Sequence, residues 1–313
     1  MVEQLHVIFG TGPVGCWTAR ALRELNLPVR AVNRSGKRPS LMPGDIEIIA
    51  ADVSLEDQAI EAARGAAVVH QATNPQYHEW HLHFPGLQAG ALAAAKAAGA
   101  RFVSIENLYM YDSSSPISEA SPIAPRSKKG ELRARMAEEV MQAHMRGDVR
   151  ATALRSSDYY GPGVLGSALG ERVFGPLVSG KKAQVGGAAD KSHSFAYIED
   201  VGRAAATLGV RGEALGKIWI APHASAWTQG AMVEKACQLL GIEPEISVVS
   251  PLMMRLAGLF VPGAKASVEM MYEFTEPFIV DSSQMEKVFG LKATPVEVGL
   301  ERTVEWYKAQ FRG

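Results

Sequence analysis

The sequence predicts an α/β protein with a Rossmann-type, doubly wound parallel sheet and a smaller, mostly helical C-terminal substrate lobe. Three observations support this fold class. Short apolar runs alternate with helical patterns through the first two thirds of the chain, a Gly-rich turn follows the first run, and helical patterns dominate the last third. Alternating strands and helices form right-handed βαβ units around a parallel sheet.

The expected strands are short runs rich in β-branched and aliphatic residues. They are residues 5–9, 29–33, 46–50, 67–71, 101–105, 150–155 and 218–221. Helices are expected between them, and at 229–240, 251–260 and 296–311 in the last third. We therefore expect a dinucleotide-binding domain over 1–160, to which the strand near 217–221 returns. A discontinuous, mainly substrate-binding lobe is expected over 161–313.

Composition limits the classes of function. The chain has 313 residues, a formal net charge of −1, and only two cysteines, Cys16 and Cys237. This balance gives no overall field that favours nucleic acid or an anionic membrane, and two cysteines suit a reducing compartment. We see no secretory leader, and the apolar run at 256–261 is too short to span a bilayer. The expectation is a cytoplasmic protein without a nucleic-acid or membrane partner.

A G-x-G-x-x-G turn lies between the first expected strand and the first helix. It consists of Gly10, Thr11, Gly12, Pro13, Val14 and Gly15. In this context the first Gly permits the tight turn, the second lets the backbone approach a pyrophosphate, and the third allows close packing of helix on strand. The helix N-terminus then faces the phosphates. The alternative is a Gly-rich turn without a ligand.

The residues after the second strand bear on the choice of cofactor. NAD sites usually place an acidic residue there, whereas this chain has Asn33 and Arg34. A guanidinium can bind a 2′-phosphate with two hydrogen bonds, so NADP(H) is favoured and NAD(H) is kept as the alternative. These charges could also be a solvated turn. Asp52 and Val53 are candidate adenine contacts, although Asp52 could instead cap a helix. Ala72, after the fourth strand, completes the expected cofactor site.

The chain resembles the extended short-chain dehydrogenase/reductase superfamily, in its NAD-dependent epimerase/dehydratase family. The motifs that carry the resemblance are residues 10–15, 51–53, 102–104 leading to Tyr111, 155–163, 195–201 and 301–307. The resemblance implies a catalytic Ser, Tyr and Lys, with the Lys also binding the nicotinamide ribose. It also implies a homodimer.

Two of those three catalytic positions differ in this chain. Lys129 matches the family's lysine, but Pro125 stands four residues before it, where the tyrosine is expected. Alignment of the preceding strand end places Asn107 at the serine position. Tyr109, two residues beyond Asn107, is our candidate for the substitute acid, because ligands bind at the carboxyl ends of parallel strands. Asn107 can donate a hydrogen bond to an oxyanion.

Several further side chains are expected to contact substrate. They are Tyr77, His78, Tyr111, Asp158 and Tyr160. The alternative for the aromatic residues is that they merely line the site. The histidines at 78, 81 and 83 could ligate a metal, but no cysteine or carboxylate partner fixes a geometry, and we expect no metal site. His70 is expected to be a core histidine.

These residues favour an NADP(H)-dependent oxidoreductase that acts on a small carbonyl, alcohol or activated alkene. An epimerase or dehydratase relies more heavily on the missing tyrosine and is ranked second. The third reading is a catalytically inactive NADP-binding redox sensor, which needs only the nucleotide site.

Overall fold

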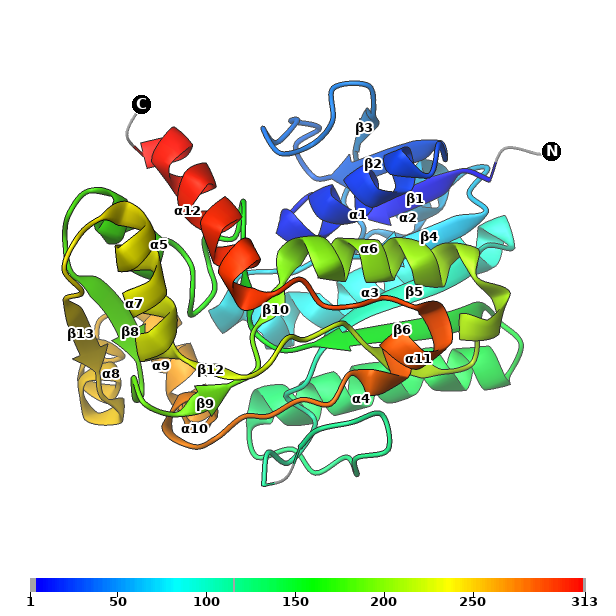
Figure 1. Cartoon of the computed structure of the whole chain (residues 1–313). Helices are drawn as coiled ribbons and strands as arrows, with labels where there is room; N and C mark the ends of the chain where they lie inside the picture. The colour runs from blue at the N-terminus through cyan, green and yellow to red at the C-terminus, as the bar shows by residue number, and fades with distance from the viewer. Residues whose placement is uncertain (1–3, 115, 312–313) are drawn as a thin grey trace. The chain divides into compact units, whose positions relative to one another are not determined.

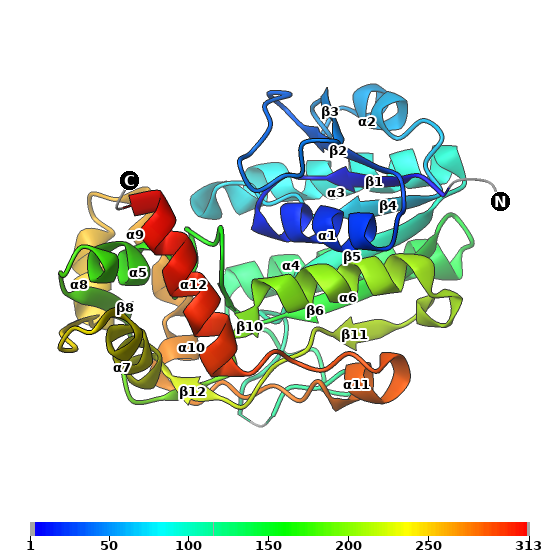
Figure 2. The same ribbon diagram turned by 45° about the horizontal axis from the view of Figure 1, so that its top comes forward.

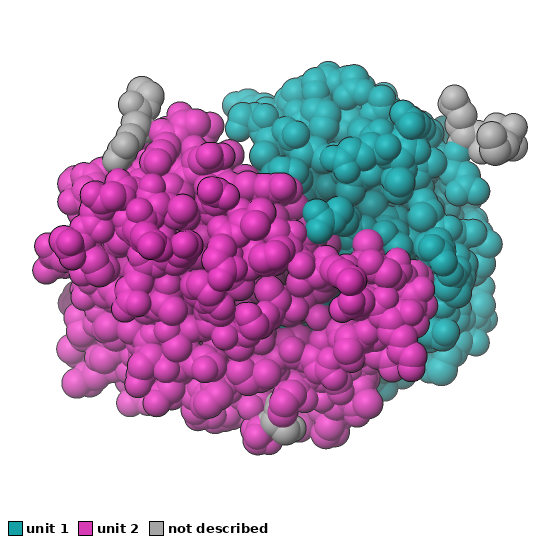
Figure 3. Space-filling model, in the orientation of Figure 1, with its two compact units in different colours: residues 1–110, 129–155, 201–221 teal, residues 111–128, 156–200, 222–313 magenta. Residues whose placement is uncertain are grey.

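The computed structural model describes residues 4–114 and 116–311, which form two compact units (Figure 3). Unit 1 comprises residues 1–110, 129–155 and 201–221, and unit 2 comprises residues 111–128, 156–200 and 222–313. The segment 201–221 joins unit 1 because its helix and strand pack onto the sheet there. The units therefore interleave along the chain more than the expected boundary at residue 160 implies.

Unit 1 is built on a seven-stranded sheet with the order β11-β6-β5-β4-β1-β2-β3 (Figure 1). The strands are β1 His6–Phe9, β2 Val29–Asn33, β3 Glu47–Ala50, β4 Val68–Gln71, β5 Arg101–Asn107, β6 Arg150–Ser156 and β11 Ile218–Ile220. Neighbouring strands pair in parallel, for example Ile8 with Ala31 on one side and with His70 on the other. All seven expected strands are confirmed within two residues at either end.

Helices cover both faces of this sheet (Figure 2). They are α1 Pro13–Glu24 and α6 Ile198–Val210 on one face, and α2 Glu56–Ala62, α3 Trp80–Ala98 and α4 Lys128–Met145 on the other. Alternate residues of β1 explain the two layers, because side chains of a strand point to opposite faces. Ile8 packs in the core with α1, whereas Val7 and Phe9 pack with α2, α3 and α4. This is the doubly wound arrangement that the sequence predicts.

Unit 2 combines short strand pairs with helices. The pairs are β7 Tyr159–Tyr160 with β10 Ala196–Tyr197, β8 Ala183–Gly186 with β13 Ile246–Val249, and β9 Ser192–His193 with β12 Trp227–Thr228. The helices are α5 Glu171–Val178, α7 Gln229–Leu240, α8 Pro251–Ala257, α9 Pro262–Ser267, α10 Tyr272–Thr275, α11 Ser283–Phe289 and α12 Val296–Phe311. Single 3-10 turns are η1 Tyr77–Glu79 and η2 Gly212–Ala214 in unit 1, and η3 Val268–Met270 in unit 2.

The core of unit 2 lies between α5, α7 and α12. Phe174 of α5 packs against Tyr307 of α12, and Val233 of α7 belongs to the same buried cluster. The helices expected at 229–240 and 296–311 are confirmed with the same bounds. The helix expected at 251–260 ends at Ala257, and a short turn then leads to α9.

Candidate functional site

The Gly-rich turn has the geometry that its sequence predicts. Gly10 has a φ of +102°, and a Cβ atom there would lie 2.4 Å from the carbonyl oxygen of Ala72. A Cβ atom on Gly15 would lie 2.0 Å from the carbonyl oxygen of Gly10. Around Gly12, by contrast, a Cβ atom would meet no atom within 4 Å among the described residues. Gly10 and Gly15 are therefore required by close packing, while Gly12 borders open space.

That open space lies at the N-terminus of α1. Gly12 is the N-cap residue, Pro13 occupies the first helical turn, and this turn holds no acidic side chain. Pro suits this position because the first amides of a helix have no partner within the helix. The amides that follow, together with the helix dipole, favour an anion. The turn therefore fits a pyrophosphate that rests against Gly12.

Asn33, at the end of β2, organises the neighbouring loop. Its Nδ2 donates to Thr11 Oγ1 at 2.9 Å and to the Lys37 carbonyl oxygen at 2.9 Å, and its Oδ1 accepts from the Ser35 amide at 3.1 Å. The Asn33 side chain thus connects the Gly-rich turn to the loop after β2. This network indicates a positioning role for Asn33.

The basic residues of this loop differ in what they contact. Arg38 donates to the carbonyl oxygens of Pro43, at 2.5 Å, and Ile46, at 2.6 Å, so its guanidinium holds the loop in place. Arg34 and Lys37 are exposed. Arg34 directly follows β2 and lies close enough to Asp52 to help lower that residue's pKa. The Arg34 guanidinium is therefore available to bind a phosphate at the carboxyl end of β2.

Asp52 and Val53 are engaged in local structure. Asp52 Oδ1 accepts from the amide of Ser54 at 3.0 Å and from its hydroxyl at 2.6 Å. These two hydrogen bonds are the main reason that the pKa of Asp52 lies below its usual value. Val53 is buried, and its carbonyl oxygen lies so close to α3 that a Cβ atom on Gly90 would be 1.8 Å from it. Asp52 thus stabilises the turn that leads to α2, whose N-cap is Leu55.

Tyr77, Tyr109 and Lys129 lie together in unit 1, and we call them the Tyr–Tyr–Lys cluster. The hydroxyl of Tyr77 lies 3.4 Å from the hydroxyl of Tyr109, and Lys129 Nζ lies 4.6 Å from the centroid of the Tyr77 ring. Lys129 is buried, whereas both tyrosines are half-buried. Trp80 stacks on Tyr109 at 5.9 Å and meets the edge of Tyr77 at 4.9 Å.

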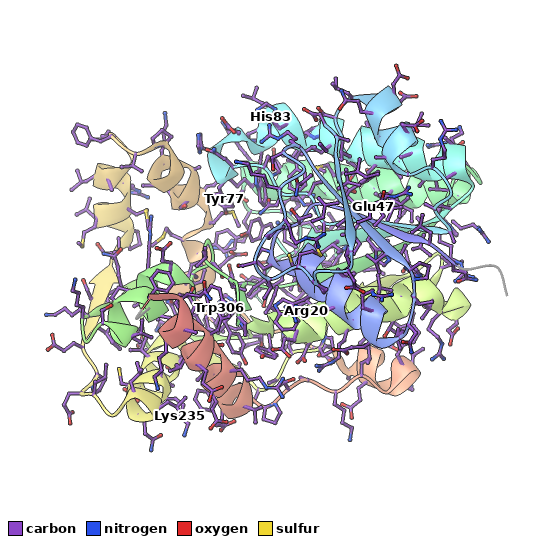
Figure 4. The ribbon with its side chains drawn as sticks, turned by 90° about the horizontal axis from the view of Figure 1, so that it is seen from above. Arg20, Glu47, Tyr77, His83, Lys235 and Trp306 are labelled. Carbon is purple, nitrogen blue, oxygen red and sulfur yellow. The ribbon has the colours of Figure 1, made fainter. Side chains whose placement is uncertain are left out.

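Three different elements supply the cluster. Tyr77 belongs to η1 after β4, Tyr109 follows β5, and Lys129 lies in the first turn of α4 (Figure 4 labels Tyr77). The tyrosines come together because β4 and β5 are neighbours whose carboxyl ends share one edge of the sheet. Asn107 Oδ1 accepts from the Tyr109 amide at 3.3 Å, which fixes the turn that presents the phenol. A buried lysine over the Tyr77 ring, together with two neighbouring phenol hydroxyls, can stabilise an oxyanion and relay a proton.

The histidines around η1 form no compact cluster. His78 Nε2 and His83 Nε2 each lie 4.0 Å from the Glu79 carboxylate, and His78 is exposed. Within residues 4–114 and 116–311, no group of three or more His, Cys, Asp or Glu side chains is arranged to hold a metal ion. His70 is a core residue as expected, and its Nε2 lies 2.9 Å from His6 Nδ1.

In unit 2, Asp158 is held by a buried histidine. His193 Nε2 lies 3.1 Å from Asp158 Oδ2, and His193 Nδ1 lies 3.1 Å from the carbonyl oxygen of Glu273. Phe195, Phe274 and Phe278 stack around the His193 ring. The Asp158 side chain keeps 14% of its surface exposed. Asp158 is thus a carboxylate that contacts a buried histidine and remains partly accessible.

Glu273 lies beneath this pair and is buried. Burial, and to a smaller extent the Asp158 carboxylate, raise the pKa of Glu273 well above its usual range. Neither carboxyl oxygen has a hydrogen-bond partner among the residues that the structure describes. No sequence pattern points to this group, because it lies in a short helix more than a hundred residues beyond Asp158.

Tyr111 and Tyr160, two expected substrate contacts, are buried in unit 2. Tyr111 is 1% exposed and forms an isolated bridge with Ile123. Tyr160 is also 1% exposed, packs on Tyr197 at 5.3 Å, and lies so close to α12 that a Cβ atom on Gly299 would be 2.5 Å from its hydroxyl. Burial raises the pKa of Tyr160 well above its usual range. These positions favour a packing role, and we leave both residues out of the proposed site.

Comparisons with known proteins agree with the fold. The model of the NAD dependent epimerase/dehydratase family matches residues 7–219. An epimerase from Methanothermobacter thermautotrophicus has a TM-score of 0.81 at 16% identity, covering 99% of this chain and 94% of that one. The dTDP-glucose 4,6-dehydratase of Bacillus anthracis, in complex with NAD, has a TM-score of 0.79 at 14% identity, covering 99% and 98%.

A third solved structure has a similar fold. The UDP-N-acetylglucosamine 4-epimerase of Bacillus cereus has a TM-score of 0.76 at 14% identity, covering 99% of this chain and 97% of that one. No curated protein matches the sequence. At these sequence identities the solved structures show only a shared fold. The match of the family model over residues 7–219 is the evidence for a family relationship.

Proposed function

Because this chain belongs to the NAD-dependent epimerase/dehydratase family, we propose that unit 1 binds a nicotinamide dinucleotide, with a preference for NADP(H). The observation that carries the proposal is the Gly-rich turn, where Gly12 borders open space at the N-terminus of α1. Arg34 supports the preference, since it is exposed at the end of β2, where NAD sites usually have an acid.

The order of the strands supports an extended pose for the cofactor. Arg34 follows β2, Gly10 follows β1, Ala72 follows β4 and Tyr109 comes after β5, and these strands lie side by side in that order. The 2′-phosphate would bind at Arg34 and the pyrophosphate at Gly12. The nicotinamide would then lie toward the Tyr–Tyr–Lys cluster, where Lys129 would bind its ribose.

We propose that Tyr109 is the proton donor and acceptor of the reaction. When bound, the nicotinamide supplies or takes up a hydride at the substrate carbon. In the reducing direction the Tyr109 hydroxyl gives its proton to the substrate oxygen, and the Tyr77 hydroxyl replaces that proton. Lys129 stabilises the negative charge that develops on the phenol oxygens. The reaction class is oxidation or reduction of a small alcohol, carbonyl or activated alkene.

A second candidate is an epimerase or dehydratase that restores its cofactor in each cycle. The family match and the sugar-nucleotide enzymes among the structural neighbours favour this candidate. Net consumption of NADPH distinguishes the two candidate functions. An oxidoreductase consumes one NADPH for each carbonyl that it reduces, whereas an epimerase or dehydratase forms product without net change in NADPH.

The test combines that balance with variants of the cluster. Aldehydes, ketones, secondary alcohols and UDP- or dTDP-linked hexoses are offered with NADPH or NADP⁺, while product and cofactor absorbance are both followed. With an active substrate, Tyr109→Phe should lower kcat about 100-fold or more. Lys129→Met should weaken cofactor binding as well, and its exposed neighbour Lys128→Met should change neither quantity.

Three outcomes would count against the proposal. Unchanged kinetics in Tyr109→Phe would remove Tyr109 from the mechanism. Product formed without net NADPH consumption would establish the second candidate. Tight NADPH binding without turnover of any compound would favour a binding protein that senses the redox state of the cofactor.

A further inference from the structure

Unit 2 exposes an apolar surface on α8 and on the turn that leads from α8 to α9. Six large apolar residues are between 49% and 87% exposed: Leu252, Met253, Leu256, Leu259, Phe260 and Val261. We call them the α8–α9 tip. Leu252 and Leu256 follow the i, i+4 spacing of one helix face, Leu259 lies in the turn beyond α8, and of the α8 residues only Met254 is buried. Such a contiguous apolar surface indicates an interaction site.

The tip protrudes from unit 2. Its most exposed residues, Leu259 at 73% and Phe260 at 87%, lie in the turn between the two helices. A Cβ atom on Gly258 would lie 2.9 Å from Lys265 Cα, so the two helices pack closely on either side of the turn. In Figures 1 and 2, α8 and α9 lie at the margin of unit 2. Apolar side chains that are exposed at such a turn are typical of a loop that inserts into an apolar environment.

The charged residues of α8 and α9 themselves are both cations. Between Glu245 and Glu269 the only charged residues are Arg255 and Lys265, and both are exposed. The two flanking acids lie outside these helices: Glu245 pairs with Lys182 at 3.2 Å, and Glu269, which keeps its negative charge, accepts from the Lys128 amide at 2.8 Å. The segment 250–267 therefore combines exposed apolar side chains with two cations and contains no acidic residue.

From this combination we propose that the α8–α9 tip docks on a lipid bilayer that carries anionic headgroups. Phe260 and its apolar neighbours would enter the interface between headgroups and acyl chains, while Arg255 and Lys265 would bind the headgroups. A two-fold dimer through the same surface is less well supported, because each copy would bring the cations Arg255 and Lys265, and no acidic residue of α8 or α9, to the contact. The proposal is independent of the proposed catalytic function.

Docking at the membrane interface is also consistent with the short length of the apolar run at 256–261. Within residues 4–114 and 116–311, no helix is long and apolar enough to cross a membrane. The apolar run at 256–261 was expected to be irrelevant to membranes because it cannot span one. Because the apolar side chains of this run are exposed, that expectation no longer follows. A short apolar turn flanked by cations can lie in the membrane interface without crossing the bilayer.

Vesicle co-sedimentation tests the proposal on the full chain. Phosphatidylcholine vesicles are compared with vesicles that also contain phosphatidylglycerol. Binding should occur with the anionic vesicles and weaken as salt is added, because salt screens the headgroup charge. Arg255→Gln with Lys265→Gln should weaken the partitioning roughly 30-fold. Phe260→Glu should abolish it, whereas the control Val288→Glu, a 40% exposed apolar site on α11, should not.

A fluorescent label gives a readout that does not depend on how much protein pellets. Cys16 and Cys237 are buried, so Phe260→Cys provides the accessible thiol for an environment-sensitive dye. The dye at position 260 should shift to the blue with anionic vesicles, and the same dye on Val288→Cys should not. Circular dichroism confirms that each variant is folded.

Two results would overturn the proposal. The first is equal or absent binding to both kinds of vesicle, with no spectral shift at position 260. The second is a dimer in light scattering that Phe260→Glu converts to monomer while anionic vesicles remain unbound. That second result would assign the tip to contact between copies of this chain.

Discussion

Arg34 is the residue on which the cofactor preference depends. Replacement by Ala removes a guanidinium from the end of β2 and keeps the hydrogen bonds by which Asn33 and Arg38 hold the loop. Charge-assisted hydrogen bonds contribute about 1.5–3 kcal/mol. We therefore expect Arg34→Ala to weaken NADPH binding about 10- to 100-fold and to leave NADH binding nearly unchanged.

Fluorescence titration of both cofactors measures this effect. The matched control is Lys37→Ala, which removes an exposed cation from the same loop. If Arg34→Ala weakens NADH as much as NADPH, Arg34 does not bind a 2′-phosphate. If both cofactors bind the unmodified chain equally, the preference itself is wrong.

At the level of single residues, the sequence predicted roles that depend on local context. The Gly-rich turn could be interpreted because Gly10, Gly12 and Gly15 are fixed by one strand, one turn and one helix. His70 could be placed in the core because its neighbours in the run are apolar. The contact of Tyr77 with Lys129 could not be predicted, since these residues are 52 positions apart and meet only through the strand order.

At the level of elements, one buried ion pair joins two neighbouring strands of unit 1. Arg155 Nε on β6 donates to Glu106 Oε2 on β5 at 2.8 Å, and the Ser104 hydroxyl donates to Glu106 Oε1 at 2.9 Å. Both charged side chains are at most 2% exposed. Glu106 directly precedes Asn107, so this pair also fixes the strand end that presents Tyr109.

Removal of one charge of this pair should be costly. Glu106→Gln leaves the Arg155 guanidinium buried without its carboxylate, and we expect the free energy of unfolding to fall by about 3–5 kcal/mol. Denaturant titration measures the change. Asp148→Asn, which breaks the surface pairs with Lys96 and Arg146, is the control and should have a much smaller effect.

A double variant separates the electrostatic cost from lost packing. Glu106→Leu combined with Arg155→Met removes both charges and keeps apolar volume, so it should recover much of the stability that Glu106→Gln loses. If Glu106→Gln is as stable as the unmodified chain, the ion pair does not hold the two strands together.

The elements of unit 1 could be predicted more completely than those of unit 2. In unit 1, apolar runs alternate with helices, and a buried parallel strand gives a clear run of aliphatic residues. In unit 2, strands such as β7 and β10 have two residues each, which is too short for any period to appear. Their pairing depends on contacts that the chain makes only after folding.

At the scale of the whole molecule, the buried pair of His6 and His70 makes stability depend on pH. The pair joins β1 and β4 at the centre of the sheet, and Gly209 of α6 packs on both rings. Burial, with a smaller repulsion from Arg101, lowers the pKa of His6 from 6.5 to about 4. Burial and the neighbouring His6 lower the pKa of His70 well below its usual range.

The direction of the pH effect follows from these two shifts. Below pH 6.5 the unfolded chain binds protons on both histidines, while the folded chain keeps His6 neutral until about pH 4. Protonation therefore favours the unfolded state over this window. His6 alone should lower the free energy of unfolding by up to about 3 kcal/mol between pH 6.5 and 4, and His70 adds to the loss.

Denaturant titrations at a series of pH values test this coupling. His6→Asn places an amide nitrogen near the position of Nδ1, and it should flatten the loss of stability between pH 6.5 and 4, whatever its effect at neutral pH. His83→Asn, which removes a histidine whose side chain is 56% exposed, should leave the slope unchanged. If His6→Asn and the unmodified chain lose stability in parallel, carboxylates elsewhere control acid unfolding and the histidine pair does not.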